Sequence, residues 1–244
     1  NAAVATRGGG VGAIVSYVYP ASPARNAGIE AGDILLRFVV SDQKKPVDIT
    51  VSELGGPQFP WAQLDQVPDV YFEQLPRPWP SRENDLTAFC TEVGAGRTVT
   101  LVFLRDGAEH SIPVEFETAP RDFTSAEKYE DDRLGVTVKD ATYDVRRYFQ
   151  METDAPGVVV ADIKPGSKAS VAGLKPCEII THVNTSPVAC VDDFAKAVAA
   201  GGDISLRVTR MFKSRVIQVH LDTVSQDAED TQTPEGEASS NTQS

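Results

Sequence analysis

The chain has 244 residues, of which 41% are hydrophobic and 24% charged, and its formal net charge is −12. This length fits one large domain or two domains of about 100 residues, and the composition is ordinary for a globular protein. No stretch approaches the roughly 20 apolar residues of a membrane-spanning helix. The acidic balance, without a run of Lys or Arg, argues against a nucleic-acid partner. Because the chain begins at Asn1 and not at Met, we interpret it as a fragment or a processed product.

The first predicted elements are two short strands on either side of a short helix. IVSYV (14–18) is typical of a β-strand because β-branched and aromatic residues favour extended backbone. A turn at Pro20 leads into a short helical segment that ends at Ala27 and Gly28, where a glycine suits a left-handed helix cap. ILLRF (34–38) then predicts the second strand.

A segment rich in proline and aromatic residues follows, at about 48–84. Proline at this density is incompatible with a regular helix or a central strand. The aromatic residues argue against a disordered segment, which is usually poor in them. We therefore expect an irregular arm that packs on a surface, either of its own domain or of another subunit or domain. Its aromatic residues are Phe59, Trp61, Tyr71, Phe72 and Trp79.

The second half of the chain repeats the order strand, short helix, strand. VVVADI (158–163) and IITHV (179–183) are short apolar runs of the kind that strands show. Between them a turn leads to a short helix that ends at Ala172 and Gly173, which again suits a glycine cap.

A longer helix and two paired strands complete the second half. Apolar residues recur at helical spacing from about 191 to 200, and Asp192 and Asp193 fall in the first turn, where the helix dipole favours anions. SLRVTR (205–210) and RVIQVHL (215–221) alternate in polarity and predict paired strands.

The two halves are copies of one pattern. At a constant offset of 145 residues, eight positions match: Gly12, Val15, Pro20, Ser22, Ala24, Ala27, Gly28 and Ile34 with Gly157, Val160, Pro165, Ser167, Ala169, Ala172, Gly173 and Ile179. Further along the offset falls to 105, where Phe89 meets Phe194 and Arg105 meets Arg210. The first copy therefore carries 40 additional residues, most of them in the proline-rich segment. A period above 100 residues indicates two domains and not a solenoid.

The segment GVVVADIKPGSKASVAGLKPCEIITHVN (157–184) resembles a PDZ domain of the type attached to HtrA/Deg serine proteases. The first copy matches the same family pattern. The resemblance implies an α+β fold with two PDZ-like domains, each a small, mainly antiparallel β-barrel or sandwich with one short and one longer helix. The expected boundaries are a first domain at 1–118 that includes the insertion at 48–84, a linker at 119–130, a second domain at 131–222, and a disordered acidic tail at 223–244.

The resemblance also implies a binding site. PDZ domains bind a peptide, usually its C-terminus, as a strand added between a β-strand and the longer helix, with the end carboxylate held by backbone amides of a tight loop. In the second domain the loop is expected at Arg133-Leu134-Gly135-Val136 and the opposite wall on the 191–200 helix. For each helix residue, packing in the core is an equal alternative. The candidate peptide-binding residues are Arg133, Leu134, Gly135, Val136, Val138, Cys190, Phe194, Ala197 and Val198.

Two departures from the family pattern limit this expectation. The matching loop of the first copy would fall before Asn1, so peptide binding by the first domain is left open. In the second copy, Cys177 and Glu178 replace the Gly32 and Asp33 of the first copy. If the backbone there has a positive φ, Cys177 is strained.

No catalytic signature is visible, and neither a cofactor nor a metal site is expected, because the three cysteines (Cys90, Cys177, Cys190) lack metal-ligand spacing. The resemblance implies the non-catalytic, tandem-PDZ part of an HtrA/Deg-like serine endopeptidase whose protease domain is missing from the chain. The alternative is a non-catalytic PDZ adaptor that assembles partner proteins. Expected partners are C-terminal or extended segments of proteins and the protease domain, with a homo-oligomer left open. The family implies an extracytoplasmic location (periplasm or envelope) or an organelle.

Overall fold

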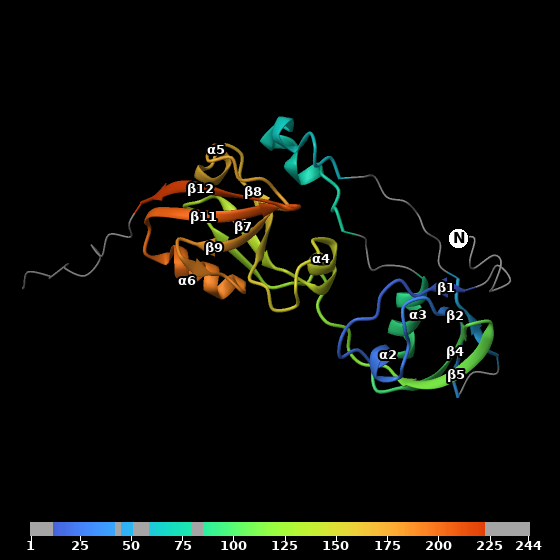
Figure 1. Cartoon of the computed structure of the whole chain (residues 1–244). Coiled ribbons are helices and arrows are strands. Elements are labelled where there is room, and N and C mark those ends of the chain that lie inside the picture. The colour runs from blue at the N-terminus through green and yellow to red at the C-terminus, as the bar shows by residue number, and fades with distance from the viewer. Residues whose placement is uncertain (1–11, 42–44, 51–58, 80–84, 223–244) are drawn as a thin grey trace, which may run out of the picture. The chain divides into compact units, whose positions relative to one another are not determined.

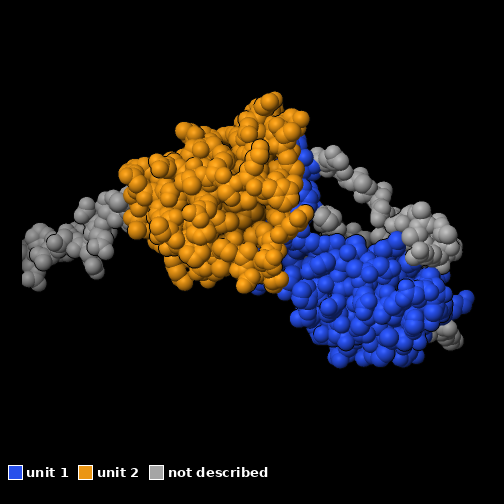
Figure 2. Space-filling view, in the orientation of Figure 1, with its two compact units in different colours: residues 1–60, 76–126, 142–148 blue, residues 61–75, 127–141, 149–244 orange. Residues whose placement is uncertain are grey.

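A computed structural model of the chain describes residues 12–41, 45–50, 59–79 and 85–222. Its contacts divide the chain into two compact units (Figure 2). Unit 1 comprises the described residues of 1–60, 76–126 and 142–148, and unit 2 those of 61–75, 127–141 and 149–244. The predicted disordered tail at 223–244 lies outside the described residues, as do parts of the insertion at 51–58 and 80–84.

Unit 1 is built on an antiparallel sheet. Its strands are β1 (Ala13–Ile14), β2 (Ile34–Val39), β3 (Val47–Asp48), β4 (Thr98–Arg105) and β5 (Ala108–Glu115). The strand order is β1-β2-β4-β5, and β3 pairs with β2 (Figure 1). The apolar faces of β2 and β4 form the core, in which Phe38, Leu101 and Phe103 are buried.

Three helices belong to unit 1: α2 (Pro23–Asn26), α3 (Asp85–Val93) and α4 (Tyr143–Tyr148). α2 begins where the hydroxyl of Ser22 accepts a hydrogen bond from the amide of Arg25, a cap that satisfies one of the unpaired amides of the first turn. Gly28 follows the helix with a φ of +90°, as the expected glycine cap requires.

Unit 2 contains a seven-stranded antiparallel sheet. Its strands are β6 (Lys128–Asp131), β7 (Val136–Asp140), β8 (Val158–Ile163), β9 (Ile179–Val183), β10 (Ser186–Pro187), β11 (Gly202–Arg210) and β12 (Lys213–Leu221). The strand order is β12-β11-β9-β8-β7-β6, and β10 pairs with β9. β6 is therefore the edge strand beside β7.

Unit 2 has two α-helices, α5 (Lys168–Val171) and α6 (Val191–Ala199), and two 3₁₀ helices, η1 (Leu64–Gln66) and η2 (Asp69–Gln74). Figure 1 shows α5 and α6 on either side of the β11–β12 ribbon. α6 buries one face, with Phe194 and Val198 fully inside the core, which explains the helical spacing of its apolar residues. Among the described helices, none combines the length and apolar content that crossing a membrane requires.

The duplication extends to strand register. In unit 1, Ile34 lies opposite Leu104, and in unit 2 the matching Ile179 lies opposite Thr209. Each of these two pairings contains one register shift, and the shifts fall at matching positions. The predicted α+β fold class, with two separate sheets and few helices, is confirmed.

The described part of the insertion is shared between the units. Residues 61–75 belong to unit 2, although the expected first domain at 1–118 included them. Leu64 is fully buried, and Phe72 is only 4% exposed because its ring lies in the core of unit 2. Trp79, by contrast, packs edge-on against Phe123 in unit 1, with ring centroids 4.6 Å apart. The irregular backbone expected from the prolines is present, as short 3₁₀ turns.

α4 was not anticipated from the sequence, and its contacts assign it to unit 1 although the expected second domain spans 131–222. Contacts between Tyr19 and α4 explain why α4 belongs to unit 1. Its hydroxyl donates a hydrogen bond to Asp144 (3.1 Å), and its ring packs against Tyr143 with centroids 5.4 Å apart. The Arg147 guanidinium lies 4.9 Å from the ring centroid of Tyr17.

Candidate functional site

The candidate site of unit 2 lies between β7 and α6, and both ends of α6 are tied to β7 or its loop. At one end the carboxylate of Asp140 accepts a hydrogen bond from the amide of Val191 (2.8 Å), the first residue of α6. At the other end the Arg133 guanidinium donates to the last carbonyls of the helix, those of Val198 (2.9 Å) and Ala199 (3.2 Å). A cation is favourable there because the helix C-terminus carries partial negative charge. These two ties fix how far the helix stands from the strand.

The loop before β7 holds a carboxylate. Asp131 is 3% exposed, and its Oδ1 accepts hydrogen bonds from the amides of Arg133 and Leu134, at 3.0 Å each. Its Oδ2 accepts a charge-assisted bond from the Arg133 guanidinium at 2.9 Å. The amide of Gly135 donates to the backbone carbonyl of Asp131 at 2.7 Å. Two successive amides therefore converge on the carboxylate, as in an anion-binding nest, and the third amide closes the turn through the backbone carbonyl.

The electrostatics of Asp131 follow from these contacts. Burial by itself would raise the pKa of this carboxyl group, but the hydrogen bonds from Arg133 and from the amide of Leu134 outweigh it and hold the pKa below its usual value. The same pairing raises the pKa of Arg133. The loop is therefore a place where a carboxylate is stable in its charged form.

β6 occupies the edge of β7 that faces α6. The two strands form an antiparallel hairpin in which Lys128 lies opposite Lys139 and Asp131 opposite Val136. β6 also contacts α6, where the ring of Tyr129 packs edge-on against Phe194 with centroids 6.1 Å apart. The main-chain groups that would pair with an added strand are thus paired within the chain.

The predicted loop residues lie between β6 and β7 or within β7. Leu134, Val136 and Val138 have side chains that are at most 1% exposed, so their contribution to binding would be their backbone groups. Gly135 has a φ of +69°, and a Cβ on it would stand 2.3 Å from the Cβ of Ser167. A glycine is required there on both counts.

The predicted helix residues differ in burial. Phe194 and Val198 are fully buried, as the core alternative proposed, although Phe194 also touches Tyr129 of β6. Ala197 is partly buried against the same core, and Cys190 is the half-buried residue directly before the helix.

Sequence reasoning missed Asp131, Tyr129 and Asp140, which organise the site. Asp131 fell at the first position of the expected second domain, and the other residues of β6, 128–130, fell within the expected linker at 119–130. A signal for Asp131 existed, because an aspartate often accepts hydrogen bonds from amides two and three residues further along. That signal predicts a local turn but does not reveal that the turn is tied to the end of α6.

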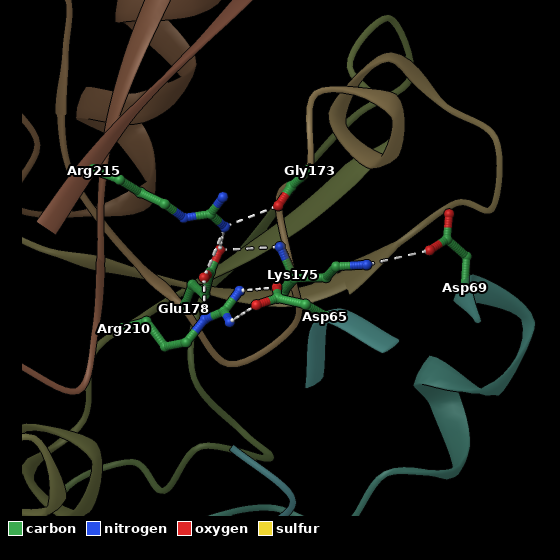
Figure 3. Close-up of polar contacts among 7 residues, drawn as sticks. All are labelled: Asp65, Asp69, Gly173, Lys175, Glu178, Arg210 and Arg215. Atoms are coloured by element: carbon green, nitrogen blue, oxygen red, sulfur yellow. Dashed lines mark hydrogen bonds and ion pairs between the residues drawn. The ribbon is translucent and has the colours of Figure 1, made fainter. Parts of the chain in front are cut away.

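A second polar cluster of unit 2 centres on Glu178 (Figure 3). Its buried carboxylate accepts hydrogen bonds from Arg210 Nε (2.6 Å) and from Arg215 at 2.8 and 2.9 Å. Arg210 also binds Asp65 of the inserted segment, at 2.8 and 2.9 Å. In unit 1 the matching pair is Asp33 with Arg105, which we interpret as a structural feature of both copies.

Cys177, directly before Glu178, has the strained backbone that a positive φ imposes. This buried residue has a φ of +63°, where the matching Gly32 of unit 1 has a φ of +102°. The backbone conformation is therefore retained in the second copy with a residue that adopts it at an energetic cost.

In unit 1 the corresponding wall is α3, which borders a pocket lined in part by Phe38, Val47, Leu86 and Phe89. At the offset of 145 residues, the counterparts of β6 and β7 would fall before Asn1. Among the described residues, no group of three or more His, Cys, Asp or Glu side chains is arranged to hold a metal ion.

The chain is similar to known proteins that are named as proteases. It is 26% identical over 204 residues to the "Probable periplasmic serine endoprotease DegP-like" of Marinomonas sp. (strain MWYL1), a match that covers 82% of this chain and 35% of that protein. A protein of the same name from Pseudomonas putida (strain W619) is 24% identical over 223 residues, covering 86% of this chain and 38% of the relative. The "Probable periplasmic serine protease do/HhoA-like" of Haemophilus influenzae is 24% identical over 187 residues, covering 77% and 30%. The chain spans about a third of the length of the curated relatives it matches.

Solved structures that are similar include the HtrA3 PDZ domain bound to a phage-derived ligand, with a TM-score of 0.32 and 18% identity, covering 40% of this chain and 88% of that one. The HtrA-type protease AlgW with a decapeptide has a TM-score of 0.34 and 19% identity, covering 55% and 43%. No family model matches the chain. The chain thus resembles the C-terminal, PDZ-containing part of HtrA/Deg serine proteases, as its repeated motif predicted.

Proposed function

We propose that this chain is the tandem-PDZ region of an HtrA/Deg-like serine endopeptidase, and that its second PDZ-like unit binds the C-terminal segments of polypeptides between β7 and α6. One observation carries the proposal. The amides of Arg133 and Leu134, together with the Arg133 guanidinium, already hold a carboxylate, that of Asp131. A loop that stabilises one carboxylate beside a strand edge has the chemistry to stabilise the end of a polypeptide.

The binding chemistry has two parts. Main-chain hydrogen bonds to β7 supply affinity for any extended segment, because they do not depend on side chains. Selection of the last residues depends on the apolar surface beside Phe194 and Ala197 on α6. Arg133 contributes a fixed positive charge near the end carboxylate, which a peptide with a blocked end does not use.

The wider role follows from the relatives and is also a proposal. The captured segment would be an exposed C-terminus or an unfolded stretch of a substrate, and its binding would be coupled to a protease domain. The names of the relatives place such proteins in the periplasm, which is the compartment we propose for this chain.

A peptide titration tests the binding proposal. The probes are pools of short peptides that end in Val, Leu or Phe, each prepared with a free carboxylate and with an amidated end. We expect binding of the free-carboxylate pool, with NMR shifts confined to amides of β6, β7, the loop between them and α6. The amidated pool should bind more weakly by roughly tenfold, since a charge-assisted bond contributes about 1.5–3 kcal/mol. Equal binding of both pools, or shifts elsewhere in unit 2, would contradict the proposed site.

A further inference from the structure

β6 pairs with the edge of β7 in the same direction that a bound peptide would have. A C-terminal peptide added to β7 runs antiparallel to it and ends at the loop before it. β6 runs antiparallel to β7 and ends, at Asp131, beside that loop. We infer that residues 128–131 are an internal ligand of the second PDZ-like unit, which an incoming C-terminal segment must displace. This inference rests on the proposed function and describes how that site is regulated.

Asp131 occupies the position that the terminal carboxylate of a peptide would take. A bound peptide would place its terminal carboxylate on the amides of the loop, and the Asp131 side chain lies on those amides instead. Its second oxygen takes the guanidinium of Arg133. Asp131 and a terminal carboxylate therefore require the same donors and cannot both have them.

The side chain of Tyr129, two residues before Asp131, occupies the apolar part of the site. Alternate residues of a strand point to the same face, so Tyr129 shares the face of Asp131. The Tyr129 ring packs on Phe194 of α6, and its hydroxyl lies 3.4 Å from Asp131 Oδ2. β6 thus fills both the carboxylate position and the apolar wall that a peptide would use.

β6 can separate from β7 without displacing α6. It is a short edge strand, and Lys128 and Glu130 are exposed. The bonds that hold α6 in place, from Val191 to Asp140 and from Arg133 to Val198, join residues outside β6. An edge strand that contributes one hairpin partner can separate while the sheet beneath it stays intact.

The internal ligand has a measurable consequence. Only the fraction of molecules with β6 displaced can bind, so the apparent dissociation constant equals the intrinsic constant divided by that fraction. A change that opens β6 should tighten peptide binding, and a change that fixes it should abolish binding.

The opening variant is Tyr129→Pro with Glu130→Pro in the full chain. Proline lacks the backbone N–H, and two adjacent prolines ensure that one of them loses a bond to β7, because bonding positions alternate along the strand. The matched control is Thr118→Pro with Ala119→Pro, at exposed positions of the connecting segment before β6. We expect the opening variant to bind the free-carboxylate peptide pool roughly tenfold more tightly or better, and the control to bind like the unaltered chain.

The locking variant is Glu130→Cys with Thr137→Cys. These residues lie directly opposite each other in the hairpin, at a spacing that a disulfide spans. We expect the oxidised form to bind no peptide and the same sample, once reduced, to regain binding. Circular dichroism and the exchange of β11 and β12 amides show in each case that the sheet remains folded.

The outcomes separate the two proposals. Tighter binding on opening together with loss on locking supports the internal ligand. Equal affinity of the opened, locked and unaltered chains overturns it and leaves the peptide site standing. Failure of the folded, opened variant to bind any free-carboxylate peptide overturns the proposed function itself.

Discussion

At the residue scale, each of the two copies has a buried acidic side chain next to the same turn. Asp33 binds Arg105 in unit 1, and Glu178 binds Arg210 in unit 2, where Arg215 adds a second guanidinium. Glu178 has no exposed surface, so its charge is stable only because both guanidinium groups and the amide of Lys175 surround it.

Replacing Glu178 by Gln should destabilise unit 2 by about 2–4 kcal/mol. The substitution keeps the size of the side chain but leaves two guanidinium groups facing a neutral partner in a buried site. Asp203→Asn is the control, because that carboxylate is 94% exposed where it pairs with His220. Hydrogen exchange of β11 and β12 measures the effect. Comparable protection in the two variants would show that the buried cluster contributes little.

Asp131 predicts an acid-dependent loss of stability. Burial favours a higher pKa, but Arg133 and the loop amides lower the pKa of Asp131 below 3.8 in the folded chain. A carboxylate whose pKa is lowered by folding contributes stability above its unfolded pKa, and this contribution is lost as the pH falls through the folded pKa. Protection of β6 and β7 amides should therefore decline below pH 3.8.

The matched variant for this prediction is Asp131→Asn, which keeps the shape but not the charge. It should show weaker protection of β6 and β7 at neutral pH and a flatter dependence on pH below 3.8, since one carboxylate no longer titrates. An unchanged pH dependence would mean that other carboxylates govern the acid response.

At the element scale, the loop before β7 is held from two sides. On one side, α6 accepts hydrogen bonds from the Arg133 guanidinium. On the other, the amide of Ala169 in α5 donates to Leu134 O (3.0 Å), and the amide of Lys164, directly after β8, donates to Gly135 O (2.8 Å). The short helix is thus part of the site through the loop it supports. This arrangement explains why the loop can present its amides in a fixed direction.

Replacing Gly135 by Ala should destabilise unit 2 by about 2–4 kcal/mol. A positive φ costs a non-glycine residue about 1–2 kcal/mol, and the new Cβ would also overlap Ser167 at the start of α5. Gly166→Ala is the control, because its φ of +72° is similar while no atom lies within 4 Å of its Cβ position. Denaturant unfolding should separate the two variants, and equal losses would show that the contact with α5 is unimportant.

At the scale of the whole molecule, the inserted segment makes unit 2 depend on residues that lie between elements of unit 1 in the sequence. Phe72 enters the core of unit 2, and the ammonium of Lys175 lies 4.8 Å from its ring centroid. Asp69 accepts a hydrogen bond from Ser170 and lies 3.7 Å from Lys175 (Figure 3). The acidic residues of the segment thus meet basic residues of the second copy.

Phe72→Ala should lower the stability of unit 2 by about 3–5 kcal/mol, because a buried aromatic side chain is replaced by a cavity. The neighbouring Tyr71→Ala is the control, since that side chain is 51% exposed. Amide exchange of β11 and β12 should respond to Phe72→Ala, and exchange of β4 and β5 in unit 1 should not. The reverse pattern would contradict the assignment of residues 61–75 to unit 2.

The repeated elements were predictable because their signals are local. Strands such as β8 and β9 show as apolar β-branched runs, α6 as helical spacing, and the caps after α2 and α5 as glycines. Each of these depends on neighbours within a few residues, and the duplication displayed every signal twice. The binding role of the loop at Leu134 to Val136 rests on a motif that resembles a known family, and it stays a prediction.

By itself, the sequence determined the duplicated α+β fold and the resemblance to proteases. Only the tertiary structure decided that β6 fills the edge of β7, that Asp131 binds the loop amides, and that Phe72 belongs to unit 2. The physical reason is the same in each case. Main-chain hydrogen bonds accept any strand, and an apolar core accepts any ring of suitable size, so the choice among competing segments depends on which one the folded chain brings near.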